Sequence, residues 1–185
     1  MNTEIEMKAW VDNPDLIQEK ILALPARKIR EYNKTDIYFH LLENGRIKQE
    51  LRLRSDADSA IVTLKEKMLD KSLEVNFERE FTVSDPEHFM YMLEGAGYLE
   101  LIRKSKRGTS WQYRNYSIEL SEIPGLGHFL ELELLVEGQV PGDNIHQIKE
   151  EAKEEFHKLF TQLGIGAEKI EHRRYTSMLI AKILG

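Results

Sequence analysis

The chain has no cysteine among its 185 residues, so no disulfide can crosslink it. It also has no apolar run near the roughly 20 residues that a helix needs to cross a bilayer, so we expect no membrane-spanning helix and no membrane partner. The first residues, MNTEIEMKAW, lack the basic start and apolar core of a signal peptide. These absences favour a cytoplasmic protein.

An excess of positive charge is missing as well. The chain has 26 Lys and Arg residues against 32 Asp and Glu residues, which gives a formal net charge of −6 at pH 7. We therefore expect no nucleic-acid partner, and an anionic ligand would need a local cationic pocket. Hydrophobic residues make up 41% of the chain and charged residues 31%, which is typical of a globular protein. The length, without a linker or repeat, predicts one domain over residues 1–185.

Four segments have the apolar spacing of amphipathic helices. The first two begin with a capping residue and a proline, Asn13 with Pro14 and then Ser84 or Asp85 with Pro86. The expected helices cover residues 12–24, 84–97, 143–163 and 173–184.

Most of the remaining sequence has the pattern of β-strands. Turn signals such as Glu43-Asn44-Gly45, Asp56-Ala57-Asp58 and Gly125-Leu126-Gly127 separate consecutive runs, as in antiparallel sheets. The sequence therefore predicts an α+β domain dominated by an antiparallel sheet, which could close into a barrel. The expected strands are residues 4–11, 27–42, 47–55, 59–67, 74–83, 98–107, 110–123 and 128–138.

Charged and apolar residues alternate in the pentapeptide EIEMK. Glu4, Glu6 and Lys8 take one side of a strand, and Ile5 and Met7 take the other. Taken alone, this pattern is typical of an antiparallel strand whose charged side faces solvent. Later strands, however, repeat like charges two positions apart, where they lie about 7 Å from each other and repel. Such doublets lower stability unless something neutralises them.

The charges on these strands combine two kinds of chemistry. Carboxylate pairs are ligands for hard divalent cations such as Mg²⁺ or Mn²⁺, and Arg or Lys pairs bind phosphate oxygens. The opposite faces are apolar, so the charged faces could line the wet interior of a barrel. The pattern predicts a metal-polyphosphate site. Its residues are Glu4, Glu6, Lys8, Arg52, Arg54, Lys65, Glu78, Glu80, Lys104, Lys106, Glu119, Glu131 and Glu133.

The same segments resemble the CYTH superfamily, also called triphosphate tunnel metalloenzymes, which includes class IV adenylate cyclases and thiamine triphosphatases. EIEMK matches the ExExK signature of that family. The resemblance continues in order along nearly the whole chain. It includes DIYF at 36–39, LRLR at 51–54, TLK at 63–65, EREF at 78–81, RKSK at 103–106, PGLGHFLELE at 124–133 and HRRYTSML at 172–179.

The resemblance implies an eight-stranded antiparallel β-barrel with flanking α-helices, whose charged tunnel binds a triphosphate and Mg²⁺ or Mn²⁺. It also implies a role for each matching residue. The metal ligands would be Glu4, Glu6, Glu131 and Glu133, with Glu119 as a further candidate. The phosphate-binding residues would be Lys8, Arg52, Arg54, Lys65, Lys104 and Lys106, with Arg174 as a further candidate. The catalytic residues would be Glu78 and Glu80, together with Lys8.

Two positions depart from the family pattern. The chain has Lys104-x-Lys106 where the family often has Lys-x-Arg, and lysine keeps the charge but loses the bidentate geometry. Ser121 stands where an aspartate commonly precedes the Gly-Leu-Gly turn, and Glu119 on the same strand face could substitute for it.

The resemblance leaves two reactions open. Attack of the ribose 3′-hydroxyl of ATP on the α-phosphate would give cyclic AMP and pyrophosphate, and the DIYF and GLGHF segments look most like the class IV cyclases that do this. Attack of water on the terminal phosphate would hydrolyse ATP, tripolyphosphate or thiamine triphosphate. A module that only binds polyphosphate or a nucleotide is an alternative of another class. A homodimer stays open too.

Overall fold

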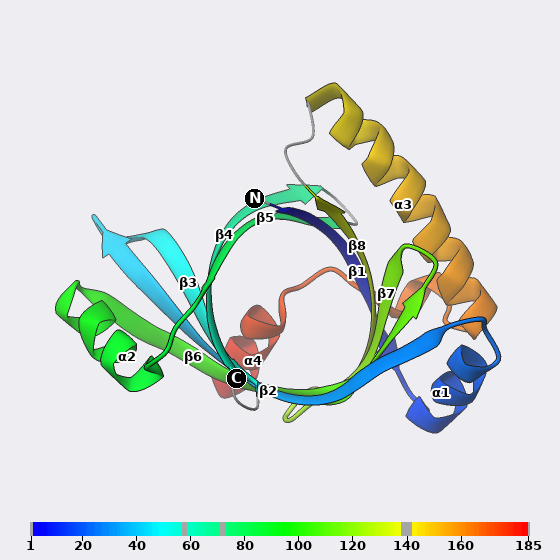
Figure 1. Cartoon of the computed structure of the whole chain (residues 1–185), viewed down its shortest axis with the longest axis horizontal. Helices are drawn as coiled ribbons and strands as arrows, with labels where there is room; N and C mark the ends of the chain where they lie inside the picture. Colours follow the sequence, from blue (N-terminus) through cyan, green and yellow to red (C-terminus); the bar gives the residue numbers. More distant parts are fainter. Residues whose placement is uncertain (1, 57–58, 71–72, 138–141, 185) are drawn as a thin grey trace.

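A computed structural model describes residues 2–56, 59–70, 73–137 and 142–184. In these residues, nine strands form one antiparallel sheet with four α-helices packed around it (Figure 1). The strands are β1 (Asn2–Val11), β2 (Arg27–Glu43), β3 (Arg46–Asp56), β4 (Ser59–Asp70), β5 (Leu73–Thr82), β6 (Tyr98–Tyr113), β7 (Tyr116–Ile123), β8 (Gly127–Glu137) and β9 (Ile170–Glu171). The helices are α1 (Pro14–Leu22), α2 (Pro86–Gly95), α3 (Gly142–Leu163) and α4 (Tyr175–Leu184).

Strands β1 to β8 curve into a ring, which Figure 1 shows from one end, and we call the interior of this ring the tunnel. The sheet order is β5-β4-β3-β2-β6-β7-β8-β1-β9, and β1 also pairs with β5. That pairing joins residues 2–6 to residues 74–78, and it is shorter than the pairing of β1 with β8, which covers Asn2–Val11. The predicted antiparallel barrel with flanking helices is confirmed.

The side chains that point away from the tunnel form hydrophobic cores beneath the helices. Ile5 and Met7 of β1 are buried in the largest core, together with Phe156 of α3 and Ile21 of α1. Figure 1 shows α1 and α3 on the same outer side of the barrel. The alternation in EIEMK is therefore explained on its apolar side, because these residues pack under helices.

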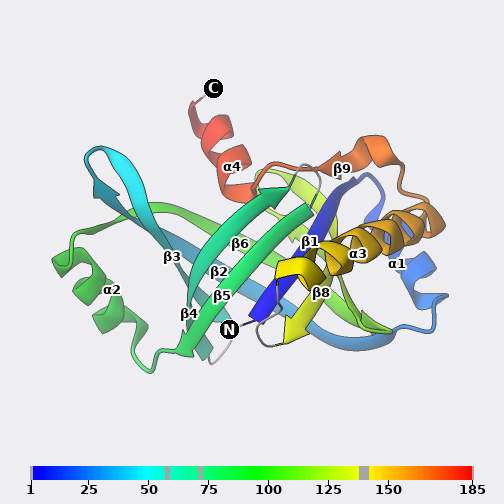
Figure 2. The same cartoon turned by 90° about the horizontal axis from the view of Figure 1, so that it is seen from above.

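Two smaller cores fix the other helices. Phe39 of β2 and Leu53 of β3 are buried with Leu93 of α2. Unlike the other two cores, the third lies on the tunnel side of the sheet, because Phe129 of β8 alternates with the cavity-lining residues Glu131 and Glu133. Phe129 packs with Tyr175 of α4, with ring centres 4.8 Å apart. Helix α4 projects on one side of the barrel, away from α2 (Figure 2). Tyr175, at the first position of α4, therefore anchors that helix to the barrel.

The ends of two helices follow the predicted capping. The Asn13 side chain accepts a hydrogen bond from the Leu16 backbone N–H at 3.1 Å. Asp85, rather than Ser84, caps α2, because its carboxylate accepts from the His88 backbone N–H at 3.0 Å. In the described part of the chain, no helix is both long and apolar enough to cross a membrane.

One strand boundary predicted from the sequence was wrong. The sequence predicts that one strand ends at residue 107 and the next begins at residue 110, but β6 continues to Tyr113 and the turn falls at Arg114, where φ is 55°. Gly108 is needed inside the strand, because an added Cβ would lie 2.3 Å from the Leu120 carbonyl oxygen. The predicted turn at Glu43-Asn44-Gly45 is present, with positive φ at both Asn44 and Gly45. Residues 57 and 58 of the other predicted turn lie outside the described residues.

Candidate functional site

The tunnel holds a cavity of about 620 Å³ with a mostly charged lining. The period of two in each strand sends every second side chain inward, opposite to the helix-covered face. Lys65 lies on β4, but its side chain is outside the described part of the structure. The other predicted site residues all line the cavity: Glu4, Glu6, Lys8, Arg52, Arg54, Glu78, Glu80, Lys104, Lys106, Glu119, Glu131, Glu133 and Arg174.

Cations gather on one side of the tunnel, on the adjacent strands β3, β2 and β6. Asp36 of β2 lies opposite Arg54 of β3 and Lys104 of β6, and Lys34 lies opposite Lys106. We call this side the basic wall. It consists of Lys34, Arg52, Arg54, Lys104 and Lys106.

Carboxylates gather on the adjacent strands β1 and β8. Glu6 lies directly opposite Glu133 in the strand register, and Lys8 lies opposite Glu131. Directly opposite like charges are unfavourable in a sheet, and a cation bound near them would offset the repulsion. We call this side the acidic wall. It consists of Glu4, Glu6, Glu131 and Glu133.

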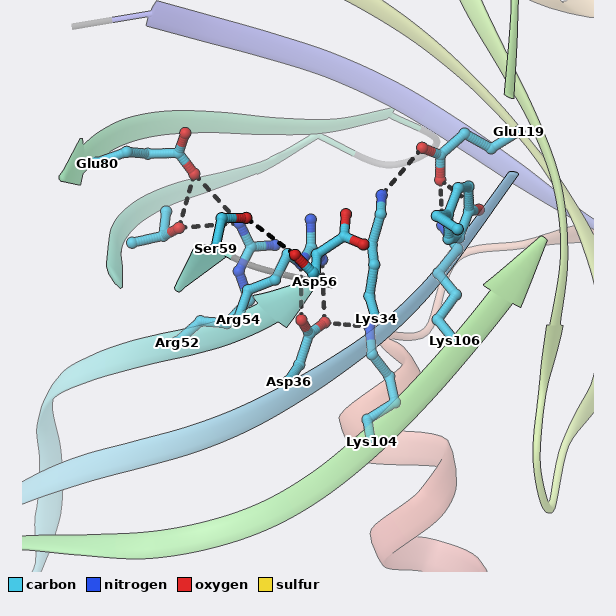
Figure 3. Close-up of polar contacts among 12 residues, drawn as sticks. Lys34, Asp36, Arg52, Arg54, Asp56, Ser59, Glu80, Lys104, Lys106 and Glu119 are labelled. Atoms are coloured by element: carbon cyan, nitrogen blue, oxygen red, sulfur yellow. Dashed lines mark hydrogen bonds and ion pairs between the residues drawn. The ribbon is translucent and has the colours of Figure 1, made fainter. Parts of the chain in front are cut away.

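Asp36 joins two cations of the basic wall from behind (Figure 3). Arg54 donates to its two oxygens, from Nε at 2.7 Å and from Nη2 at 3.0 Å, and Lys104 Nζ lies 3.0 Å from Oδ2. Burial alone would raise the pKa of the Asp36 carboxyl. The positive charges of Lys104 and Arg54 have the larger effect and hold this pKa well below its usual range. Asp36 therefore stays ionised inside the protein.

Glu119 of β7 forms a second cluster with the basic wall (Figure 3). Its oxygens lie 2.6 Å from Lys106 Nζ and 3.2 Å from Lys34 Nζ, and the Tyr32 hydroxyl donates to it at 2.9 Å. Lys106 also lies 2.5 Å from Glu131 of the acidic wall. Although burial raises the pKa of Glu119, Lys106 and Lys34 hold it well below its usual range. In this structure Glu119 is a counter-ion to two lysines.

Arg52 and Glu80 meet through Thr63. Arg52 Nη2 donates to Thr63 Oγ1 at 2.9 Å, and Thr63 donates to Glu80 at 2.7 Å. Arg52 Nη2 also lies 3.3 Å from Glu80. Arg52 Nε is buried and has no hydrogen-bond partner among the described residues. A buried donor of this kind suits an anionic ligand, because leaving it unbonded is costly.

The acidic wall has the properties of a divalent-metal site. Burial and the nearby carboxylates of Glu4, Glu119 and Glu6 raise the pKa of Glu133 well above its usual value. A bound cation would relieve this repulsion, and carboxylate oxygens suit Mg²⁺ or Mn²⁺. Among the described residues, however, no three carboxylate or imidazole groups form a ready-made cage. The residues fit a metal that takes its remaining ligands from phosphate and water.

Helix α4 and the residue before it line one part of the cavity. Arg174 and Tyr175 line it, and the Tyr175 ring centre lies 5.3 Å from Lys8 Nζ and 5.1 Å from Lys104 Nζ. The segment before the helix is fixed by Glu171, which accepts from Trp10 Nε1 at 2.9 Å and pairs with Arg173 Nη2 at 2.7 Å. Arg173 and Arg174 therefore differ, because Arg173 binds Glu171 and Arg174 lines the cavity.

Sequence reasoning missed several residues of this site. Lys34 and Tyr38 line the cavity, and Asp36 lies behind it. All three are on β2. Near Lys34 this strand has no pair of like charges two positions apart, so the signal that indicated the inward face of the other strands is missing there. The DIYF and HRRYTSML motifs contained Asp36 and Tyr175, but the motifs alone did not show what these residues contact.

Comparison with protein families gives one match over nearly the whole chain. A family model described as the CYTH domain matches residues 2–175. A Methanocaldococcus jannaschii protein that is named as a candidate adenylate cyclase is 24% identical over 177 residues, which are 95% of this chain and 97% of that protein. The similarity therefore extends through all the strands that line the tunnel.

Solved structures share the fold. A protein from Pyrococcus horikoshii has a TM-score of 0.78 and 27% identity, over 94% of this chain and 98% of that one. A Hippeastrum protein, described as a candidate adenylyl cyclase with a dominant triphosphatase activity, has a TM-score of 0.66 and 16% identity, over 97% of this chain and 94% of that one. At that identity the Hippeastrum protein is evidence for the fold alone.

Proposed function

Since this chain belongs to the CYTH domain family, we propose that it is a metal-dependent enzyme acting on a triphosphate group in the tunnel, with conversion of ATP to cyclic AMP and pyrophosphate as its leading reaction. The observation that carries the proposal is the placement of the basic wall and the acidic wall around one cavity. A triphosphate bound with a divalent metal needs cations on one side and carboxylates on the other. The cyclase assignment is supported by the name of the Methanocaldococcus jannaschii relative.

The basic wall would hold the phosphate chain. Arg52 and Arg54 present planar guanidinium groups, which bind two phosphate oxygens at once. Lys104 and Lys106 add compact positive charges from β6, which β2 separates from β3 in the sheet. Fixing the phosphates in this way positions the phosphorus atom for in-line attack and stabilises charge on its oxygens.

The acidic residues would bind the metal and accept the proton. Glu4, Glu6, Glu131 and Glu133 would hold Mg²⁺ or Mn²⁺, which when bound supplies positive charge to the phosphate oxygens. In the cyclase reaction, the 3′-oxygen forms a bond to the α-phosphorus while the bond to the β-phosphate oxygen breaks, and pyrophosphate leaves. Glu80, which is 43% exposed, would accept the 3′-hydroxyl proton at its carboxylate, with Glu78 beside it on the same strand face.

Hydrolysis of the terminal phosphate is the second candidate, and the cavity lining favours it. Leu135 is the one aliphatic side chain among the described lining residues, which otherwise carry charges or hydroxyl groups. Apart from Leu135, a nucleoside base would find apolar surface there only on the rings of Tyr38 and Tyr175, whereas tripolyphosphate needs none. In this reaction water replaces the ribose hydroxyl, and orthophosphate is released.

One assay tests the function and distinguishes the reactions. The protein is incubated separately with ATP, tripolyphosphate and thiamine triphosphate, each with Mg²⁺ or Mn²⁺, and cyclic AMP, orthophosphate and pyrophosphate are resolved. Cyclic AMP with equimolar pyrophosphate would establish the cyclase, and orthophosphate would establish the hydrolase. Turnover that persists without metal would overturn the metal requirement. No turnover of any substrate would overturn the enzyme proposal, and calorimetry with tripolyphosphate would then detect a binding module.

A pair of variants connects turnover to the walls. Replacing Glu6 by Gln removes a carboxylate of the acidic wall, and we expect metal-dependent turnover to fall by about 100-fold or more. Replacing Glu122 by Gln, on the same sheet, breaks only the pairing with Arg107, which is 66% exposed, and should leave turnover unchanged. Equal activities in the two variants would remove Glu6 from the site.

A further inference from the structure

We propose that Asp36 is a positioning residue, which fixes the Arg54 and Lys104 side chains for the phosphate groups. This inference rests on the proposed function, since it assigns a task to a residue behind the substrate-binding surface. Asp36 is 0% exposed and does not belong to the cavity lining, whereas Arg54 and Lys104 do. Asp36 is therefore not positioned to contact a substrate in the cavity, and its contacts are with these two cations.

The backbone places the three residues side by side. In the strand register, Asp36 of β2 lies opposite Arg54 of β3 on one side and opposite Lys104 of β6 on the other. Figure 3 shows the Asp36 carboxylate between the two cations. The contacts to Arg54 are the two hydrogen bonds of a bidentate pair, at 2.7 and 3.0 Å, which fixes the plane of the guanidinium.

Both cations keep donors for a ligand after they have bound Asp36. A guanidinium has five N–H groups, of which Arg54 uses two on Asp36, and an ammonium has three, of which Lys104 uses one. Lys104 Nζ also lies 5.7 Å from the Tyr38 ring centre and 5.1 Å from that of Tyr175. These rings and Asp36 limit where the ammonium can lie.

Asp36 does not itself attract phosphate. Two cations and one carboxylate leave a net charge of +1, and the carboxylate reduces the attraction for an anion. The carboxylate weakens phosphate binding, but it can speed the reaction by holding the two cations at defined positions. Misplacement of a binding group by about 1 Å can slow a reaction about 100-fold. Asp36 should therefore matter more for turnover than for binding.

The test is the Asp36→Asn variant, which keeps the shape of the side chain and removes its charge. We expect kcat to fall roughly 10- to 100-fold. The dissociation constant for tripolyphosphate, measured by calorimetry without metal, should stay the same or decrease, because the cations have lost a competing negative charge. A residue with only a structural role would lower the melting temperature and leave kcat per folded molecule unchanged. That result would overturn the proposal, and so would weaker binding with unchanged kcat.

Asp56→Asn is the matched control. Asp56 lies on β3 and pairs with Arg30 Nη1 at 2.8 Å, but Arg30 is 53% exposed and neither residue lines the cavity. We expect its kcat and its tripolyphosphate affinity to equal those of the wild-type protein. If the wild-type protein turns over no triphosphate and does not bind tripolyphosphate, the proposed function fails. If it does turn over a triphosphate while Asp36→Asn keeps the full kcat, this inference alone fails.

A measurement on the wild-type protein covers the case in which Asp36→Asn does not fold. The Arg54 Nε proton bonds to Asp36, so its exchange with solvent, followed by NMR, should be slow both without a ligand and with bound tripolyphosphate. Fast exchange in the bound state would mean that the pair breaks when the phosphate binds, and it would overturn the positioning role.

Discussion

Glu119 and Glu133 are both carboxylates that line the tunnel, yet their neighbours shift the two pKa values in opposite directions. Lys106 and Lys34 lower the pKa of Glu119 against the effect of burial. Burial raises the pKa of Glu133, and the carboxylates of Glu4, Glu119 and Glu6 raise it further. At the scale of the residue, Glu119 is already paired with protein cations, and Glu133 is the carboxylate with most to gain from a metal.

The Glu133→Gln variant tests this difference. An acid whose pKa is raised in the folded state destabilises the protein as pH rises above the unfolded value near 4.5, because the folded state resists deprotonation. Without metal, the stability of the variant relative to the wild-type protein should therefore increase as pH rises from about 4.5 to 8. Mn²⁺ should raise the wild-type melting temperature more at high pH, since the metal displaces the proton, and should have a smaller effect on the variant.

Thermal unfolding, followed by circular dichroism with and without Mn²⁺, gives both results. Glu122→Gln is the control, because Glu122 pairs with Arg107 on the outside of the sheet. Parallel stability curves for the wild-type protein and Glu133→Gln across this pH range would show that Glu133 carries no unfavourable charge.

At the scale of the element, the approach of β6 to β7 depends on Gly108. A Cβ at this position would lie 2.3 Å from the Leu120 oxygen and 2.8 Å from the Ser121 Cα, which are both backbone atoms and cannot rotate away. We expect Gly108→Ala to lower the free energy of unfolding by roughly 3 kcal/mol. Gly95→Ala is the control, since nothing lies within 4 Å there and it is in helix α2, so stability should hold or rise by up to about 1 kcal/mol. Urea unfolding measures both, and equal effects would contradict the packing role of Gly108.

Strand β9 holds the start of helix α4 through Glu171. Hydrogen bonds from Arg173 lower the pKa of Glu171 to about 2, below the ordinary value of 4.5. An acid whose pKa is lower in the folded state stabilises that state at any pH above the pKa of the unfolded chain. For Glu171, this contribution is lost as pH falls from about 4.5 to about 2. At pH 7, the free energy of unfolding of Glu171→Gln should therefore be about 2 kcal/mol lower than that of the wild-type protein. This value allows for solvent screening of the ion pair, because Arg173 is exposed.

The stability difference between the wild-type protein and Glu171→Gln should shrink as pH decreases through that window. Urea titrations between pH 7 and pH 3 measure it, with Glu168→Gln as the control because Glu168 is exposed nearby. A difference that is constant with pH would mean that the ionised form of Glu171 is not what stabilises the segment.

The sequence predicted these elements unevenly, and the reasons are local. Helices α1 and α2 could be predicted because Asn13 and Asp85 cap them directly before a proline. The inward face of β1 could be predicted from its alternation. The junction of β6 and β7 could not be predicted, because Gly108 favours a strand end in the sequence and its contact with Leu120 across the strands is visible only in the structure. Strand β9 is two residues long and has no pattern of its own.

Most residues of the site could be predicted from the sequence, but the ion pairs among them could not. The charged doublets placed Arg54, Lys104 and Glu133 on inward faces. That Asp36 lies between Arg54 and Lys104 follows only from the order β3-β2-β6 in the sheet. Tyr175 enters the tunnel from a helix at the other end of the chain from β1. Sequence alternation reports which face a residue takes, whereas the neighbour across the sheet depends on topology.

The topology also predicts how a ligand should affect the barrel. β1 and β5 carry carboxylates and meet along a short pairing between residues 2–6 and 74–78, while the basic wall lies on β2, β3 and β6. Tripolyphosphate with Mg²⁺ would connect these strands across the tunnel and reduce the repulsion among Glu4, Glu6 and Glu133. Binding should therefore stabilise the β1–β5 pairing more than the long pairing of β2 with β6.

Hydrogen exchange followed by mass spectrometry measures this effect. In the free protein, amides of residues 2–6 and 74–78 should exchange faster than those of residues 33–38, which lie in the middle of the β2–β6 pairing. Mg²⁺ with tripolyphosphate should slow the first group most, and the Glu6→Gln variant should lose most of that protection. Uniform slowing over all strands would indicate general stabilisation by the ligand, and it would contradict a bridge between the two walls.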